Sequence, residues 1–334
     1  MKGSMRLQAI LLVLLFAAVT PAWSQTGPEV KTNRPPLDQV LKYLPGYHSN
    51  PSQNAVQTGG VKQDAVHSAA AKVYTFATVD YPGAASSTIF DTNNSTTVGF
   101  LQFDPTSVPA TPETAFTVKS WVYEVLLVPG ATESGATGIN TSGQIVGFYT
   151  DSSMVAHGFV DTAGTFTDVD YPSATGTEVI GINDAGVMVG AYSDTSGNIH
   201  GFIDNGGTFT SLDYPGASST IGAGINSSGE IVGVWEDSMS NTYGFIDNGG
   251  VFTSLSFPLG YDTEAIGVNN RGEIAGYYQD ATSLYHGFIY SGGAFAEVDV
   301  AGSSGTQLTR IKNQGAITGV FFDALTETHG MKGH

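Results

Sequence analysis

The feature that most constrains this 334-residue chain is a repeat with a fixed period of 43 residues. The tripeptide His-Gly-Phe, or a close variant of it, recurs at that interval. The copies begin at His157, His200, Tyr243, His286 and His329. A period of about 20 to 50 residues is typical of arrays of small structural units that share one continuous core. The repeat therefore constrains the architecture before any residue chemistry is considered.

Several other residues recur at the same interval. A Gly-Ile-Asn tripeptide or a variant stands at 138–140, 181–183, 224–226 and 267–269, and a degenerate copy is Arg310-Ile311-Lys312. An aspartate follows each short apolar run, at Asp151, Asp194, Asp237, Asp280 and Asp323. A weaker copy upstream contains Val79-Asp80-Tyr81-Pro82, which matches 169–172. We count six units between about Tyr74 and the C-terminus.

Each unit is predicted to hold four short strands and no helix. In the unit at 207–249 the strands are expected at 208–214, 220–226, 230–235 and 243–247. Asn226 to Gly229 forms the turn between the second and third strands, and Asn248-Gly249 marks a tight hairpin into the next unit. Forty-three residues leave no room for a helix beside four strands. The chain is predicted to be all-β.

The third strand of each unit is apolar on both faces, as in the segment 145–149. Both faces of its sheet must then be covered, which a β-propeller achieves by stacking four-stranded sheets around an axis. The array of repeats begins with the strand that comes first in each unit and ends with the strand that comes fourth. We expect these two to pair and close a six-bladed ring, which removes two exposed edges. An open β-solenoid is the alternative, although its coils are usually shorter.

The repeat resembles that of the HAF family of predicted extracellular bacterial proteins. The resemblance is carried by Gly-Ile-Asn-x-x-Gly-x-Ile-Val-Gly-x-Tyr followed by His-Gly-Phe, where the family has His-Ala-Phe. It covers residues 120–334 well and 74–119 weakly. It implies an exported bacterial protein and no particular activity.

The N-terminal region differs in composition from the repeats. Residues 1–24 combine Lys2 and Arg6 with a short apolar run and small residues near position 24, as a signal peptide does; an uncleaved anchor is the alternative. Residues 25–73 are rich in Pro, Gly, Gln, Asn and Ser and are predicted to be a largely disordered linker, or a segment that docks on a partner. The β-propeller is expected over 74–334. The mature protein is predicted to be secreted or periplasmic, with no membrane span after signal cleavage.

The net charge of −18 at pH 7 bounds the choice of partners. Such a surface repels nucleic acid and anionic lipid. The chain has no cysteine, so strand pairing and packing must hold it without disulfides. The remaining partner classes are an extracellular protein or a polysaccharide.

The repeated histidines and aspartates are interpreted as parts of the architecture. His157, His200, His286 and His329, with Tyr243 in the same slot, are expected to stabilise their blades through a hydrogen bond, with the recurring Asp as the candidate partner. A metal site is the functional alternative for the histidines, and calcium is the alternative for the aspartate series Asp104, Asp151, Asp194, Asp237, Asp280 and Asp323. No cofactor is predicted, and calcium is left open.

Four aromatic residues form a third candidate group. They occupy one slot of the repeat, usually before a proline, and are Tyr81, Tyr171, Tyr214 and Phe257. They would lie along one rim, either packed over the blade edge or exposed to stack on a ligand.

No motif for nucleophilic, metallopeptidase or phosphate chemistry is present in the sequence. We therefore predict a non-catalytic binding or structural module, with partner choice in the variable segments 152–156, 195–199, 238–242 and 281–285. The alternative is a propeller-type polysaccharide hydrolase or lyase with an acidic pair at the channel mouth. Such an enzyme is expected to break the symmetry of the ring there with charged residues from several blades.

Overall fold

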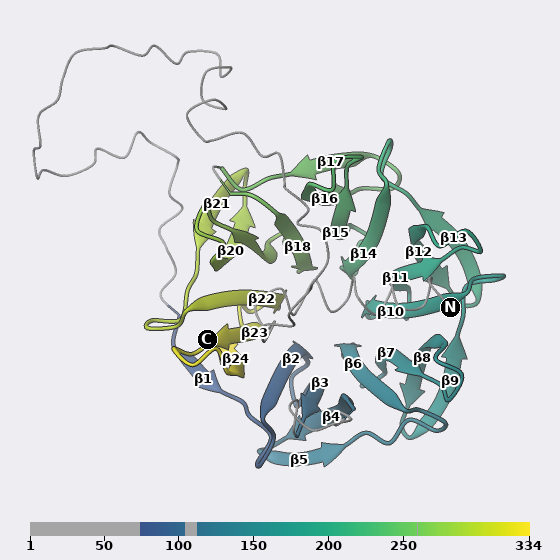
Figure 1. The fold of residues 1–334 in the computed structure, drawn as a ribbon, viewed down its shortest axis with the longest axis horizontal. Helices are drawn as coiled ribbons and strands as arrows, with labels where there is room; N and C mark the ends of the chain where they lie inside the picture. The colour runs from purple at the N-terminus through teal and green to yellow at the C-terminus, as the bar shows by residue number, and fades with distance from the viewer. Residues whose placement is uncertain (1–73, 104–111, 259) are drawn as a thin grey trace, which may run out of the picture. The chain divides into compact units, whose positions relative to one another are not determined.

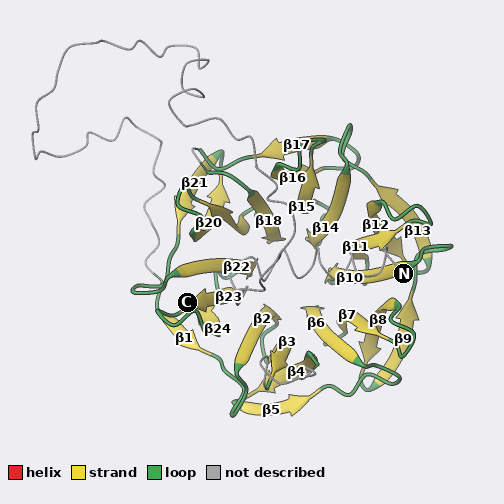
Figure 2. Ribbon diagram, viewed as in Figure 1, coloured by secondary structure: helices red, strands yellow, loops and turns green. Residues whose placement is uncertain are grey.

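A computed structural model describes residues 74–103, 112–258 and 260–334. These residues form six four-stranded antiparallel sheets arranged around a central axis, which is the predicted six-bladed β-propeller (Figure 1). Figure 2 shows strands and connecting loops only in this part of the chain. Nowhere in these ranges is there a helix that could span a membrane. The predicted signal peptide and linker, residues 1–73, lie outside the described residues.

The six blades follow one another along the chain, and each begins with the strand nearest the axis (Figure 1). Blade 1 comprises β2 (Ser86–Thr92), β3 (Thr96–Gln102), β4 (Thr114–Lys119) and β5 (Val122–Val125). Blade 2 comprises β6 (Glu133–Ile139), β7 (Ile145–Thr150), β8 (Ala156–Thr162) and β9 (Thr165–Val169). Blade 3 comprises β10 (Gly176–Ile182), β11 (Met188–Ser193), β12 (Ile199–Asn205) and β13 (Thr208–Leu212). Blade 4 comprises β14 (Ser219–Ile225), β15 (Ile231–Glu236), β16 (Thr242–Asp247) and β17 (Phe252–Leu255). Blade 5 comprises β18 (Thr263–Val268), β19 (Ile274–Gln279), β20 (Tyr285–Ser291) and β21 (Ala294–Glu297). Blade 6 comprises β22 (Gly305–Ile311), β23 (Ile317–Phe322), β24 (Thr328–Gly333) and, on its outer edge, β1 (Phe76–Thr78).

The turns within the predicted unit agree with the sequence to within a residue. The turn from β14 to β15 is closed by a 3.1 Å bond from the Gly229 N–H to the Asn226 carbonyl, and Gly229 has φ of +85°. The hairpin from β16 to β17 is centred on Gly249 and Gly250, both with positive φ, one position after the predicted dipeptide. Glycine suits these positions because it adopts positive φ without a steric penalty.

The repeated phenylalanine and a repeated glycine pack against each other. The Phe of each His-Gly-Phe is fully buried, and its ring lies over the repeated glycine of the adjacent strand, which is the second strand of the blade. A Cβ on Gly190, for example, would lie 2.8 Å from the Phe202 ring. The period of 43 residues therefore carries one packing unit, a large ring over a bare backbone, through blades 2 to 5, and Met331 takes the place of the ring in blade 6.

The ring closes as predicted, through pairing of the first strand with the last. β1 runs antiparallel to β24, with Phe76 opposite Gly333 and Thr78 opposite Met331. The Val79 N–H also donates to the Gly330 carbonyl at 2.8 Å. The open solenoid is excluded by this closed arrangement.

Candidate functional site

A belt of asparagines surrounds one mouth of the central channel. Each belt residue directly follows an innermost strand, and its Nδ2 donates to the backbone carbonyl of the equivalent residue in the next blade at 3.1–3.2 Å. The donors are Asn93, Asn140, Asn183, Asn226 and Asn269, and the last acceptor is the Lys312 carbonyl. The asparagine of each Gly-Ile-Asn tripeptide therefore links neighbouring blades as well as forming a turn.

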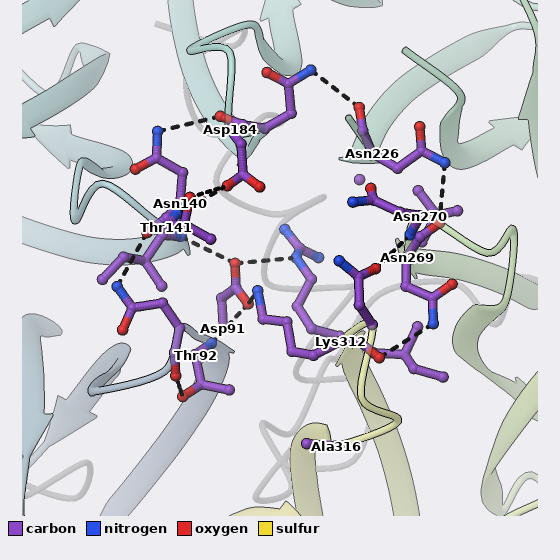
Figure 3. A pocket seen from close by; sticks show the side chains of 18 of the residues that line it. Asp91, Thr92, Asn140, Thr141, Asp184, Asn226, Asn269, Asn270, Lys312 and Ala316 are labelled. Carbon is purple, nitrogen blue, oxygen red and sulfur yellow. Dashed lines mark hydrogen bonds and ion pairs between the residues drawn. The ribbon is translucent and has the colours of Figure 1, made fainter. Parts of the chain in front are cut away.

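The belt changes character at its sixth position, where Lys312 replaces asparagine. The Lys312 Nζ instead forms an ion pair with Asp91 Oδ1 at 2.5 Å, joining blade 6 to blade 1 (Figure 3). Asp91 is 3% exposed and also accepts the Thr92 and Ile139 N–H groups at 2.7 and 3.1 Å. One charged pair thus takes the place of the sixth amide link.

Arg310 fills the axis directly below this belt. Its guanidinium donates to five backbone carbonyls at 2.7–3.3 Å, one from each of blades 2 to 6, and its Nε lies 3.8 Å from Asp91 Oδ2 of blade 1. The accepting carbonyls belong to Thr137, Ile180, Ala223, Ile266 and Thr309. A single side chain therefore contacts all six blades.

The neighbouring glycines make room for this arrangement. Asp91 and Arg310 occupy the slot that is glycine in the other four blades, at the same bulge of each innermost strand. Those glycines are Gly138, Gly181, Gly224 and Gly267. A Cβ on Gly224 would lie 2.7 Å from the Ile266 carbonyl oxygen, so larger residues there would push apart the blades that meet around Arg310.

Above the belt, the mouth widens into a funnel of about 430 Å³. Its floor is the buried belt with Asp91 and Arg310, and its rim is formed by the exposed residues that follow each belt position. Three rim side chains accept a backbone N–H from the preceding blade at 2.8–3.0 Å: Asp184, Asn270 and Asn313. Figure 3 shows Asp184 and Asn270 among the lining side chains. No Phe, Tyr or Trp lines the funnel within the described part of the chain, and His334 contributes the one ring to its lining.

Lys332 brings a third cation to the funnel. It lies on β24, lines the same space and reaches the Thr92 hydroxyl at 3.4 Å. Burial, with a further contribution from the charge of Lys312, lowers the pKa of Lys332 from its ordinary value. Arg310, Lys312 and Lys332 are three of the five Lys and Arg residues in the described residues, in a chain whose net charge is −18.

The repeated histidines lie at the opposite end of the blades from the belt. In each blade that has the histidine, the belt residue follows the first strand and the histidine lies at the start of the third, as Asn183 does after β10 and His200 does in β12. Because the strands are antiparallel, these two positions lie at opposite ends of the sheet. Each histidine Nδ1 pairs with an aspartate that the sequence analysis did not single out, at 2.6–2.9 Å; these are Asp170, Asp213, Asp299 and Asp80. The predicted partners, Asp151, Asp194, Asp280 and Asp323, lie farther away, 3.5–3.8 Å from Nε2.

The composition of the blades explains this pairing. Blade 4 has Tyr243 and Ser256 where other blades have His and Asp, and blade 1 has Thr114 and Leu127. The two partners are present or absent together, as expected of a local contact between neighbouring strands.

The repeated aspartates also have a role in the turns. Asp237 accepts the Met239 and Asn241 N–H groups, the same turn contacts that the other four repeated aspartates make.

The four candidate rim aromatics are half-buried and packed against other rings. Tyr171 stacks on Tyr192 with ring centroids 3.7 Å apart, and Tyr192 stacks on His200. Tyr214 on Trp235 and Phe257 on Tyr278 repeat this arrangement, whereas Tyr81 makes edge contacts with Phe103, Phe116 and Tyr123. Each ring lies in the link that follows the outer strand of one blade and packs against rings of the next blade.

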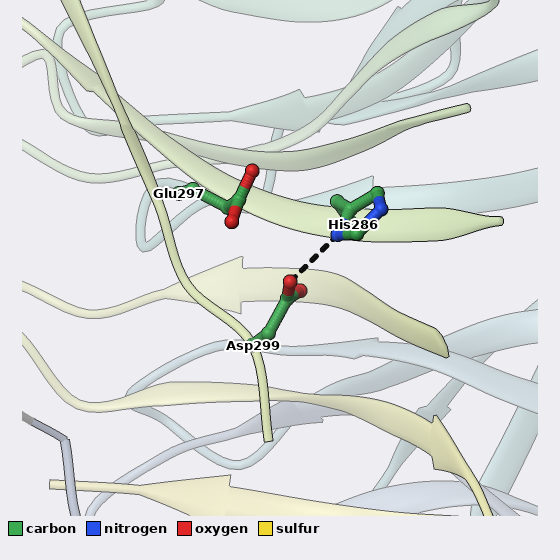
Figure 4. Close-up of side chains that lie close together, drawn as sticks. All are labelled: His286, Glu297 and Asp299. Atoms are coloured by element: carbon green, nitrogen blue, oxygen red, sulfur yellow. Dashed lines mark hydrogen bonds and ion pairs between the residues drawn. The ribbon is translucent and has the colours of Figure 1, made fainter. Parts of the chain in front are cut away.

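Two groups of side chains come close enough to share a metal ion: His286 with Glu297 and Asp299, and Asp323 with Glu327 and His329. Figure 4 shows the first group, in which His286 is already bonded to Asp299. Glu297 in turn accepts the Tyr278 hydroxyl at 2.6 Å. These contacts account for the positions of the first group without an ion, and calcium binding stays a prediction.

Three acidic or amide side chains are buried deeper along the innermost strands. Glu178, Glu264 and Gln307 occupy one slot of blades 3, 5 and 6 and are at most 5% exposed. Tyr277 donates its hydroxyl to Glu264, whereas Glu178 Oε1 and both amide atoms of Gln307 have no hydrogen-bond partner within the described residues. Burial raises the pKa of Glu178 well above its ordinary range, and the nearby Glu113 adds to that shift.

Comparison with known proteins supports the fold alone. No family model and no curated protein matches this sequence. TolB from Acinetobacter baumannii has a similar structure, with a TM-score of 0.51 and 12% identity over 72% of this chain and 63% of that chain. This chain thus spans less than two-thirds of TolB. AofleA from Arthrobotrys oligospora gives a TM-score of 0.49 at 12% identity, covering 76% of this chain and 85% of that one. A fucose-specific lectin from Aleuria aurantia gives 0.48 at 12% identity, covering 76% and 96%.

Proposed function

We propose that this protein is an exported, non-catalytic binding module that takes a polar ligand at the funnel of the central channel. The observation that carries the proposal is the break of the six-fold pattern at Asp91, Arg310 and Lys312, which gives one mouth a distinct charged floor. Pockets of about 300 to 1,000 Å³ with a few convergent polar groups are the usual form of small-ligand sites. The ligand would be a unit of an extracellular polysaccharide or a segment of an extracellular protein.

The broken symmetry is the feature we associated with an enzyme in the sequence analysis, but the residues involved favour binding. A glycoside hydrolase needs two carboxyl groups free to act as acid and as base or nucleophile. The described lining residues include two carboxylates, Asp91 and Asp184. Asp91 is buried and shared by two backbone N–H groups, Lys312 and Arg310, so it is not available for proton transfer. Asp184 alone does not make an acidic pair.

The export of the chain and its membership of the HAF-repeat proteins stay part of this proposal. The composition of residues 1–24 and the repeat motif support them. Detection of the mature N-terminus outside the cytoplasm would test the first point.

A glycan array tests the binding function with two matched variants. Ser227 is exposed on the funnel rim, so Ser227→Trp should block the funnel and abolish binding. Ser196 is exposed on a turn at the opposite end of blade 3, within a variable segment, so Ser196→Trp should leave binding intact. Loss of binding in Ser196→Trp with retention in Ser227→Trp would move the site to the variable segments and refute the funnel.

A further inference from the structure

We propose that the funnel is specific for a small hydroxylated acid, such as a uronic acid unit of a polysaccharide, whose carboxylate lies against Lys332. This inference rests on the proposed binding function and adds the chemical class of the ligand. It depends on the charge balance of the funnel and on the kinds of donors that line it.

The charges at the funnel floor are not balanced within the protein. Asp91 is the counter-ion of both Arg310 and Lys312, at 3.8 and 2.5 Å. The Lys332 ammonium makes no ion pair among the described residues, and its one hydrogen bond there, to the Thr92 hydroxyl, is 3.4 Å long. An anion placed beside Lys332 would supply the missing counter-charge.

The distribution of basic residues strengthens this argument. The other two Lys and Arg residues of the described region are Lys119, exposed at the end of β4, and Arg271, which pairs with Glu273. In a protein with this excess of acidic residues, the funnel, with three basic side chains against Asp91 and Asp184, is a local cationic region. Such a region concentrates anionic ligands relative to neutral ones.

The partial burial of Lys332 makes an anion more favourable still. Burial and the Lys312 charge both disfavour the ammonium form, which is why its pKa is lowered. A bound carboxylate would reverse this shift, because an opposite charge nearby favours the charged form. Charge-assisted hydrogen bonds of this kind are about twice as strong as neutral ones.

The remaining lining groups suit hydroxyl groups rather than apolar side chains. The amide nitrogens of Asn270 and Asn313 are exposed on the rim, while their oxygens are held by backbone N–H groups of the preceding blades. Asp184 offers an exposed acceptor on the same rim. The described lining residues include no Phe, Tyr or Trp and one imidazole, that of His334, so polar contacts rather than stacking on large rings must orient a sugar here.

Calorimetric titration with galacturonate, galactose and inorganic phosphate tests the inference. The wild-type chain should bind galacturonate and its short oligomers at least about tenfold more tightly than galactose, as expected for one charge-assisted contact. Lys332→Gln, which keeps a long polar side chain, should lose about tenfold in galacturonate affinity. Lys119→Gln removes the same charge from an exposed residue that does not line the funnel, and it should bind as the wild type does.

Three outcomes would overturn the inference. Unchanged galacturonate binding by Lys332→Gln would refute the role of that ammonium, provided that the variant melts as the wild type does. Phosphate binding as tight as galacturonate binding would show that the hydroxyl groups contribute nothing. Equal affinities for galactose and galacturonate, both abolished by Ser227→Trp, would refute the acid specificity and leave the proposed binding function standing. If Ser227→Trp binds galacturonate normally, the proposed function itself fails.

Discussion

Arg310 and Asp91 face each other on the axis of the ring, 3.8 Å apart, although they come from the last and first blades. Both replace a residue that is glycine in the other four blades. The pair neutralises a buried charge, and the guanidinium satisfies five carbonyls that would otherwise face an empty axis. Contacts at the axis therefore hold the blades together in addition to the β1–β24 pair at the outer edge.

Replacing Arg310 should destabilise the whole ring. Arg310→Met keeps much of the side-chain volume but leaves five carbonyls and part of the Asp91 charge uncompensated. Breaking a buried charged network in this way costs about 3–5 kcal/mol. Urea unfolding should show that loss, whereas Arg271→Met, which removes an exposed ion pair with Glu273, should change stability by less than about 1 kcal/mol. Equal stabilities of the two variants would contradict the central role of Arg310.

The closing pair β1–β24 should be needed for full stability. Hydrogen-bonded pairs alternate along an antiparallel ladder, and the bonds of Thr75 with His334 and of Val79 with Gly330 place Ala77 in such a pair with Lys332. Ala77→Pro removes the donor and should lower the melting temperature by several degrees. Ala77→Ser retains the N–H group and serves as the control. A proline variant that melts with the wild type would show that closure adds no stability.

Glu178 should make the protein less stable as the pH rises. Its folded pKa is raised by burial, so the folded state holds a proton that the unfolded state releases above pH of about 4.5. Stability is then lost as the pH climbs from that value towards the folded pKa. Glu178→Gln removes this penalty, so its stability relative to the wild type should improve between pH 4.5 and pH 8 in urea unfolding. A difference that stays constant over this range would contradict a raised pKa.

Asp194 should act in the opposite direction. Its carboxylate accepts the Asn198 and Ser196 N–H groups, both at 2.8 Å, and the Asn198 side-chain amide at 2.9 Å. The Asn198 backbone bond is the main cause of its lowered pKa. A depressed carboxyl pKa gives stability that is present above the unfolded value, near 3.8, and is lost as the pH falls through the folded value.

The matching experiment compares Asp194→Asn with the wild type. The wild type should be the more stable protein at pH 6, and the difference should shrink as the pH is lowered from 4 to 2. Thermal unfolding followed by circular dichroism would measure this. A difference that grows on acidification would show that the carboxylate is not stabilised in the folded state.

The sequence predicted the fold in detail because packing within a propeller is local and repeated. Gly190 and Phe202 lie twelve residues apart, on adjacent strands of one blade, and every copy of the pair solves the same packing problem. Turn residues such as Gly229 add their own backbone preference. Even ring closure followed from the register of the repeats, since a first strand without a predecessor and a last strand without a follower are complementary edges.

The candidate site was not predicted from the sequence, although a trace of it was present. Arg310-Ile311-Lys312 was identified only as a degenerate copy of Gly-Ile-Asn, and Asp91 was not singled out. The nearest partners of the histidines were missed, because Asp170 and its equivalents, which pair with Nδ1, lie in a different part of the repeat from the predicted aspartates, which lie 3.5–3.8 Å from Nε2. Departures from the repeat at one slot were the signal that would have indicated the site.

The amino-acid sequence by itself determined the blade, the number of blades and the way they close, because each depends on contacts between neighbouring strands that recur every 43 residues. Tertiary structure alone decided what happens at the axis. Six equivalent positions meet there in a space that holds one large side chain, so Arg310 can be accommodated once, with glycine around it and Asp91 as its counter-charge. In the linear sequence these six positions are equivalent and far apart, and they become neighbours only when the ring closes.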